Sequence, residues 1–252
     1  MGKHWGQHFF WNKGLAEKIV NLIDIKGNDF VIEVGPGKGI LTEFILNKTK
    51  NLLAIEIDKN LIELLHEKFP ELNIINKDFI KTDISEYIKE GKFKFVSNLP
   101  YKISSPTLLK FFYNREQFIE GVIVIQKELA ERIVSKEGSK KYSPLSILLQ
   151  IFFDIKIAFH LSPGSFNPPP QVDSSAIVIK KREIPLIKIR EPLRFKAFLD
   201  RLFNQRRKKL KNNLLENELS ILKNNPDIQM RAEQLDIYKL YGLYKEIYET
   251  DK

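Results

Sequence analysis

The side chains in this chain best suited to chemistry lie at residues 98–101, which read Asn-Leu-Pro-Tyr after an apolar stretch. The exocyclic amine of adenine is a poor nucleophile because its lone pair is delocalised into the ring. The side-chain oxygen of Asn98 and a backbone carbonyl near Pro100 could accept the amine hydrogens, while Tyr101 and Phe166 stack on the base. The pattern predicts a pocket for a flipped-out adenine. A strand that ends in an ordinary turn is the alternative, because Asn and Pro are common turn residues.

A second chemical signal lies at residues 33–39, which read Glu-Val-Gly-Pro-Gly-Lys-Gly. Glycines at a strand end let the backbone approach a ligand closely, and the following helix offers free amides at its start. The spacing Gly-x-Gly-x-Gly differs from the Gly-x-Gly-x-x-Gly of dinucleotide-binding proteins and disfavours a nicotinamide cofactor. Glu56 closes the next predicted strand, where a doubly wound fold places the carboxylate that binds ribose hydroxyls. Asp78 follows the third strand and could accept a hydrogen bond from an adenine amine. The arrangement resembles the class I methyltransferases, which use S-adenosylmethionine, although each acid alone fits a solvated loop.

The elements that must position these residues alternate between strand-like and helix-like patterns. Strands are predicted at residues 30–34, 52–57, 73–76, 93–96, 122–125, 155–159 and 175–180. Helices are predicted at residues 13–23, 40–47, 59–69, 104–113, 127–135 and 145–152. Such alternation predicts an α/β fold with a doubly wound, mainly parallel sheet that is covered on both faces.

The pattern changes after Pro185, where strand-like segments stop. Four segments with helical periodicity follow, at residues 194–204, 206–215, 218–223 and 235–248. We therefore predict a catalytic domain of residues 1–185 and a small all-helical domain of residues 186–252.

Composition limits the class of protein. With 252 residues and 43% hydrophobic content, the chain can bury one good-sized core and a small second one. It has no cysteine, which excludes disulfides and thiol chemistry, and its four histidines lack metal-ligand spacing, so no metal site is expected. The longest apolar stretch, residues 145–153, is too short to span a bilayer, and no targeting signal is recognisable, so a cytoplasmic location is expected. A net charge of +9 predicts an anionic partner, and nucleic acid fits better than a membrane surface.

Four separated motifs, in order, resemble one family, the KsgA-type ribosomal RNA adenine N6,N6-dimethyltransferases. They are Gly6-Gln7-His8-Phe9, the Asn-Leu-Pro-Tyr sequence, the run from Phe166 to Ser174, and Phe203-Asn204-Gln205-Arg206-Arg207-Lys208. The resemblance spans residues 6–214. It implies a class I, Rossmann-like methyltransferase fold with S-adenosylmethionine as cofactor. It also implies dimethylation of two adjacent adenines near the 3′ end of small-subunit (16S) ribosomal RNA, with a role in ribosome biogenesis.

The resemblance also implies roles for individual residues. Contacts to S-adenosylmethionine are implied for His8, Phe10, Gly35, Gly37, Glu56, Asp78 and Asn98. Handling of the target adenine is implied for Asn98, Pro100, Tyr101 and Phe166. The chain departs from the family pattern at Phe10 and Asn12, where members commonly have Leu and Asp. Trp5 and Trp11 fit either a core or a lid.

RNA binding is expected from basic residues in the C-terminal part. A run without acids contains Arg201, Arg206, Arg207, Lys208, Lys209 and Lys211. Together with Lys140, Lys141, Lys180, Lys181 and Arg182, the run predicts a phosphate-binding surface. A solvated helical face is the alternative interpretation. The expected partner is small-subunit ribosomal RNA in a pre-ribosomal particle, bound by a monomer.

Three other functions fit parts of the sequence. An Erm-type enzyme would methylate a single large-subunit adenine, but the match at residues 203–208 favours the small-subunit type. The chain could instead act mainly as a ribosome-assembly or RNA-binding factor, a role compatible with catalysis. A nicotinamide-dependent oxidoreductase is the third, and the glycine spacing disfavours it.

Overall fold

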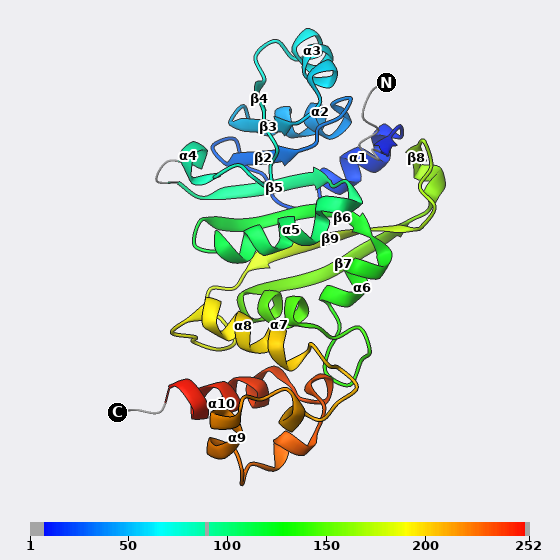
Figure 1. Ribbon diagram of the computed structural model, residues 1–252. Helices are drawn as coiled ribbons and strands as arrows, with labels where there is room; N and C mark the ends of the chain where they lie inside the picture. The colour runs from blue at the N-terminus through cyan, green and yellow to red at the C-terminus, as the bar shows by residue number, and fades with distance from the viewer. Residues whose placement is uncertain (1–7, 89–90, 250–252) are drawn as a thin grey trace. The chain divides into compact units, whose positions relative to one another are not determined.

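The computed structural model of the protein describes residues 8–88 and 91–249, which form two compact units (Figure 1). The first unit runs to Ala130 and includes Asp154–Lys181. The second unit comprises Glu131–Phe153 and the residues from Arg182 onward. Residues 131–153 therefore belong to the same unit as the C-terminal helices, although they precede two strands of the sheet in sequence.

A seven-stranded sheet organises the first unit. Its order is β4 (Asn73–Asn76), β3 (Leu52–Glu56), β2 (Phe30–Val34), β5 (Phe93–Asn98), β6 (Phe118–Gln126), β9 (Ser174–Lys181) and β7 (Phe153–Leu161). The pairs from β4 to β6 are parallel, and β9 is antiparallel to β6. The central strands are continuous buried runs, as parallel strands covered on both faces require. The predicted doubly wound, mainly parallel fold is confirmed.

One helix precedes the first parallel strand, and the others follow the strands in sequence. They are α1 (Lys13–Val20), α2 (Ile40–Leu46), α3 (Lys59–Lys68), α4 (Ser85–Ile88), α5 (Tyr101–Tyr113) and α6 (Lys127–Ile133). Two of them begin at side-chain caps: Asn12 accepts a hydrogen bond from the Leu15 amide, and Asp58 accepts one from the Asn60 amide. None of the helices in the described part of the chain has the length and apolar content needed to cross a bilayer.

The second unit is helical and has its own aromatic core. Its helices are α7 (Pro144–Phe152), α8 (Pro192–Leu202), α9 (Glu216–Ile221) and α10 (Ile237–Tyr248). Phe195 and Phe198 of α8 pack against Tyr244 of α10 with ring centroids 5.1 and 5.7 Å apart. This cluster buries the apolar faces of both helices.

The predicted helix at residues 206–215 is wrong. Residues 204–207 form a turn in place of that helix, and a short 3-10 turn follows at Leu210–Asn212. The side chain of Asn213 donates to the Leu202 carbonyl at 2.9 Å and so satisfies an end of α8 that a continuing helix would have used. In a helix, Arg206 and Lys209 would also be like-charged neighbours three residues apart, which is unfavourable.

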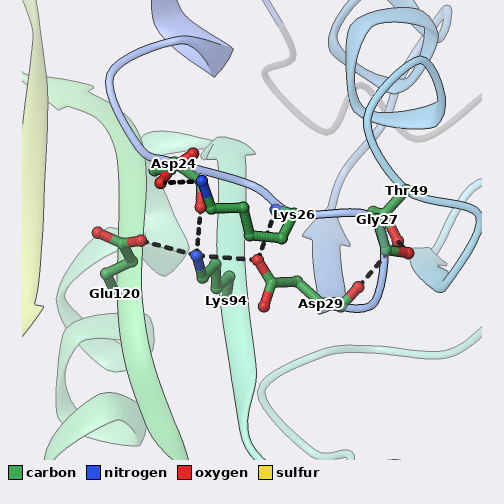
Figure 2. Close-up of polar contacts among 7 residues, drawn as sticks. All are labelled: Asp24, Lys26, Gly27, Asp29, Thr49, Lys94 and Glu120. Carbon is green, nitrogen blue, oxygen red and sulfur yellow. Dashed lines mark hydrogen bonds and ion pairs between the residues drawn. The ribbon is translucent and has the colours of Figure 1, made fainter.

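A buried lysine joins the strands at their amino ends (Figure 2). The ammonium of Lys94 in β5 lies 2.9 Å from Asp29, just before β2, and 2.9 Å from Glu120 in β6. It also donates to the Asp24 carbonyl, and its side chain is only 8% exposed. The network links the starts of three neighbouring parallel strands, whose opposite ends carry the candidate site.

Candidate active site

The glycine-rich loop lies at the carboxyl end of β2 and leads into α2. Gly35, Gly37 and Gly39 have φ angles of +64°, +59° and +76°, a region that other residues rarely adopt. A β-carbon on Gly37 would lie 2.7 Å from the Phe9 ring, and one on Gly39 would lie 2.6 Å from the Phe69 ring. The loop thus has a left-handed backbone and lies close to the rings of Phe9 and Phe69, and both features require glycine.

Glu56 ends β3 and is held by backbone amides. One carboxylate oxygen accepts hydrogen bonds from the amides of Ile57 at 2.8 Å and Asp58 at 3.0 Å, and the other accepts one from Gly37 at 3.4 Å. Burial raises the pKa of Glu56, and the three amides oppose that rise by stabilising the charged form. The result is a fixed acceptor beside the glycine loop.

Glu33 lies two residues before the loop and is fully buried. Its Oε2 accepts a hydrogen bond from Thr42 at 2.7 Å, while its Oε1 has no hydrogen-bond partner among the described residues. Burial raises the pKa of Glu33 to about 8, although the Thr42 bond opposes the rise. The carboxyl group is therefore mainly protonated at neutral pH.

A pocket of about 700 Å³, its open mouth included, lies at the carboxyl ends of β2, β3, β4 and β5. Its lining residues are Val34, Gly35, Ile55, Glu56, Ile57, Lys77, Asp78, Phe79, Pro100, Lys102 and Ile103. The volume and the mostly apolar walls with two carboxylates suit a nucleoside-sized ligand. The predicted Gly35, Glu56 and Asp78 are thus brought together, with Gly37 joined to them through its hydrogen bond to Glu56.

Asn98 and its neighbours form the junction between β5 and α5. The Asn98 side-chain nitrogen donates to the His8 carbonyl at 2.7 Å, which leaves the side-chain oxygen available as an acceptor. The Pro100 carbonyl already accepts the Ile103 amide at 3.0 Å at the start of the helix. The Tyr101 hydroxyl lies 2.9 Å from the buried Ser174 hydroxyl, and burial raises the pKa of Tyr101.

The short strand β1 (Phe9–Phe10) lies next to this junction, since the preceding residue, His8, accepts the hydrogen bond from Asn98. It pairs with β8 (Phe166–Asn167), and the rings of Phe10 and Phe166 stack with centroids 4.8 Å apart. His8 Nδ1 lies 2.8 Å from the Pro168 carbonyl oxygen. Phe10 is thereby a buried core residue, which also lines a small hollow beside Gly35 and Asn98.

A second pocket of about 390 Å³ adjoins the first, because Gly35 and Pro100 line both. Its remaining lining residues are His8, Phe9, Asn98, Leu99, Tyr101 and Phe166. The residues predicted to handle an adenine, Asn98, Pro100, Tyr101 and Phe166, therefore line one pocket although they come from two distant parts of the chain. Little of the Phe166 side chain is accessible, because it is buried against Phe10.

Sequence reasoning missed several residues of these pockets. Phe79, Lys102 and Ile103 line the larger pocket, and Ser174 fixes Tyr101. Phe79 and Lys102 could have been predicted, because each directly follows a predicted site residue. No sequence pattern indicates that Ser174 is the partner of Tyr101. Trp11 is exposed and donates to the Gly164 carbonyl at 2.9 Å, so it is not a core residue. Trp5, Gly6 and Gln7 lie outside the described residues.

The predicted basic residues of the second unit differ in their surroundings. Arg206 donates to the Tyr142 carbonyl at 2.7 Å and to Glu233 at 3.1 Å. The side chains of Arg207, Lys208, Lys209 and Lys211 are exposed. Arg206 thus serves contacts within the unit, and the other four present their charges to solvent.

The sheet order, the glycine loop with Glu56 and Asp78, and the adjoining pocket around Asn98 define a Rossmann-like methyltransferase. The family model described as "Ribosomal RNA adenine dimethylase" matches residues 1–249, and the chain belongs to this family. It is accordingly an rRNA adenine dimethyltransferase in class, with S-adenosylmethionine as its methyl donor.

Comparisons with individual proteins agree with the family match. The chain is 41% identical over 210 residues to "Ribosomal RNA small subunit methyltransferase A" of Malacoplasma penetrans, covering 83% of this chain and 76% of that one. It is 38% identical to the protein of the same name from Flavobacterium johnsoniae, covering 97% and 95%. A crystal structure of a dimethyladenosine transferase from Plasmodium falciparum matches with a TM-score of 0.80 at 27% identity, covering 96% and 98%. The 23S rRNA methyltransferase ErmE has the same fold, with a TM-score of 0.68 at 21% identity, covering 95% and 99%.

Proposed function

We propose that this protein dimethylates the N6 amines of two adjacent adenines near the 3′ end of small-subunit ribosomal RNA. The observation that carries the proposal is the orientation of Asn98. Its side-chain nitrogen donates to the His8 carbonyl, so its side-chain oxygen remains free to accept a hydrogen bond from the adenine amine. This oxygen belongs to a pocket that adjoins the nucleoside-sized one. The names of its relatives support the choice of the small-subunit RNA.

The residues of the larger pocket fit S-adenosylmethionine. Glu56 would accept hydrogen bonds from both ribose hydroxyls, because its carboxylate is already fixed by three backbone amides. Asp78 would accept a hydrogen bond from the adenine amine, and the apolar Phe79 and Ile57 would contact the base. Gly35, shared by the two pockets, allows the reactive end of the cofactor to approach the acceptor base.

The protein's part in methyl transfer is mainly positioning. The bound cofactor supplies an activated methyl group, so no protein nucleophile is required. Asn98 Oδ1 and the Leu99 carbonyl would accept the amine hydrogens and direct the nitrogen lone pair, since the Pro100 carbonyl is already used by α5. Alignment of this kind contributes on the order of 7–11 kcal/mol in intramolecular models. The same acceptors stabilise the positive charge that develops on the nitrogen.

Tyr101 and Phe166 would hold the faces of the flipped adenine. Ser174 fixes the Tyr101 ring through the hydroxyl contact, and Phe10 fixes the Phe166 ring by stacking. His8 would complete the cofactor side of the pocket. After the first methyl transfer the cationic amine releases one proton to water, and the neutral monomethylated amine keeps one hydrogen, which Asn98 can accept for the second round.

RNA binding is proposed for Arg207, Lys208, Lys209 and Lys211, with Arg206 holding the turn that carries them. In this proposal residues 1–185 are the catalytic domain and residues 186–252 the helical RNA-binding domain, although residues 131–153 and 182–185 belong to the same compact unit as the C-terminal helices. The substrate would be RNA within a pre-ribosomal particle, met in the cytoplasm by a monomer.

The test is single-turnover methyl transfer to small-subunit particles that lack the modification, followed by mass spectrometry of the RNA. We expect dimethyladenosine at two neighbouring positions, and Asn98→Ala should slow transfer by about two orders of magnitude or more. Cofactor affinity is measured alongside, because Asn98 does not line the larger pocket and a large loss of affinity would point to a cofactor contact instead. Transfer by Asn98→Ala within tenfold of the wild type would refute the assigned role. Large-subunit RNA is assayed in parallel, and modification of that RNA alone would favour the Erm-type activity.

A further inference from the structure

Lys110 connects the helix that starts at the catalytic motif with the loop that forms one wall of the larger pocket. It lies in α5, and its ammonium donates a hydrogen bond to the Thr82 carbonyl. The same ammonium is 5.1 Å from the centroid of the Phe79 ring, a cation–π distance. Lys110 does not itself line the pocket, but it touches the segment that does.

Hydrogen bonds within that segment, residues 78–83, tie Thr82 and Ile80 to Asp78. The Asp78 carbonyl accepts the Thr82 amide at 3.0 Å and the Thr82 hydroxyl at 2.8 Å, and the Asp78 side chain accepts the Ile80 amide at 2.9 Å. The hydrogen bond from Lys110 to the Thr82 carbonyl therefore also restricts the position of the Asp78 side chain. Phe79 is buried between the pocket and Phe95, whose ring centroid is 5.7 Å away.

Keeping a charged amine in this partly buried place has a cost. Burial lowers the pKa of Lys110, and the nearby charges of Asp83 and Asp78 oppose the shift. The amine thus contacts one carbonyl and one ring face and is influenced by the charges of two acids, all of which belong to the same loop. A methionine would fill the same volume but would leave the Thr82 carbonyl without its donor and the two acids without a counter-charge.

We propose that Lys110 is a positioning residue that sets the place of Asp78 and Phe79 and thereby the recognition of the adenine amine of S-adenosylmethionine. The inference rests on the proposed role of Asp78. It makes α5 a common support for both pockets, because the helix begins at Tyr101 in the acceptor pocket and reaches the cofactor loop through Lys110.

The experiment measures calorimetric dissociation constants of the full-length protein for S-adenosylhomocysteine and for its analogue with hypoxanthine in place of adenine. The variants are Lys110→Met, Lys110→Arg, Asp78→Asn and the double variant Lys110→Met with Asp78→Asn. Lys18→Met is the matched control, because Lys18 also lies over a phenylalanine ring, 4.4 Å from the centroid of Phe159, outside the pocket. Thermal unfolding of each variant separates loop positioning from general loss of stability.

We expect Lys110→Met to weaken S-adenosylhomocysteine binding about tenfold and to reduce the preference for adenine over hypoxanthine. Lys110→Arg should recover most of the affinity, Lys18→Met should bind like the wild type, and the double variant should be little weaker than Asp78→Asn. Unchanged binding by Lys110→Met, or additive effects in the double variant, would overturn the role of Lys110. An unaltered base preference in Asp78→Asn would instead overturn the proposed role of Asp78, so the two failures are distinguishable.

Discussion

At the residue scale, buried carboxylates in the first unit serve two different purposes. Burial raises the pKa of both Glu56 and Glu33, but three backbone amides oppose the rise at Glu56, whereas a single hydroxyl donor opposes it at Glu33, whose pKa reaches about 8. Both lie close to the glycine loop and affect each other, since the charge of Glu56 raises the pKa of Glu33. Local donors, more than burial alone, decide which acid can accept hydrogen bonds from a ligand.

Replacement of Glu56 by Gln tests its role with almost no change in size. The amide would lose the charge-assisted bonds to ribose, each about 1.5–3 kcal/mol, and its NH₂ group would face the backbone amide donors. We expect cofactor affinity to fall tenfold or more in a calorimetric titration with S-adenosylhomocysteine. Glu63→Gln, on the exposed surface of α3, is the control. An unchanged dissociation constant for Glu56→Gln would show that the ribose lies elsewhere.

Glu33 makes stability depend on pH. Because its folded pKa of about 8 exceeds the unfolded value near 4.5, the native state keeps a proton that the unfolded state releases. The stabilising contribution is complete below pH 4.5 and is lost as the pH rises toward 8, by up to roughly 1.4 kcal/mol per pH unit. Urea unfolding at about pH 5 to 8 should show this decline in the wild type and a flatter profile in Glu33→Gln. Parallel profiles for the two proteins would contradict the protonated state.

At the element scale, the starts and ends of the parallel strands have different tasks. Their carboxyl ends line the pocket that we propose for the cofactor, and their amino ends are joined by the Lys94 network (Figure 2). The network joins segments whose mutual position also sets the register of the strand ends, because β2 pairs with β5 and β5 with β6. The ion-pair network and the candidate site thus lie at opposite ends of the same strands.

Lys94→Met should be strongly destabilising. The substitution leaves Asp29 and Glu120 as partly buried charges without a partner, a change that typically costs about 3–5 kcal/mol. Urea unfolding measures the loss. Lys26→Met is the matched control, because Lys26 pairs with Asp24 in an exposed ion pair whose loss is expected to be small. Equal effects of the two substitutions would mean that the buried network adds little to stability.

At the scale of the whole molecule, the two units divide the work between base chemistry and RNA binding in the function that we propose. Both pockets lie within the first unit, and the exposed cations Arg207, Lys208, Lys209 and Lys211 lie in the second. Phosphate contacts and base contacts respond differently to salt, so the two contributions can be measured separately.

Replacing Arg207 and Lys208 by Ala should weaken RNA binding. The slope of log affinity against log salt concentration should become less steep by about 0.7–0.9 for each phosphate that is no longer neutralised. Cofactor affinity should stay the same. Tyr101→Ala should keep the slope and remove base stacking of roughly 1–3 kcal/mol, seen as slower transfer. Affinity for the RNA across a salt series measures both sets. Equal slopes for the charge variant and the wild type would mean that these cations form only a solvated surface.

Much of the local structure could be predicted from the sequence. Strands β2 and β4 match the predicted residues 30–34 and 73–76, and the glycine loop and Asn98 lie where their patterns indicated. Periodicity and turn chemistry depend on near neighbours, which is why these predictions succeeded. The helix predicted at residues 206–215 failed because this segment bonds to distant residues: the Leu210 amide donates to the Met230 carbonyl at 2.8 Å, and the Asn213 side chain donates to the Leu202 carbonyl at 2.9 Å.

Contacts between distant segments were decided only by the tertiary structure. No local pattern shows that Asn98 donates to the His8 carbonyl, that Phe10 stacks on Phe166, or that Tyr101 meets Ser174. Nor does one show that Arg206 is bound to the Tyr142 carbonyl and Glu233 rather than free. The residue types and their order along the chain thus determined the chemistry and the family. Packing of segments that are remote in sequence determined which atoms of those residues remain available, because each hydrogen bond made within the fold removes one that a ligand could use.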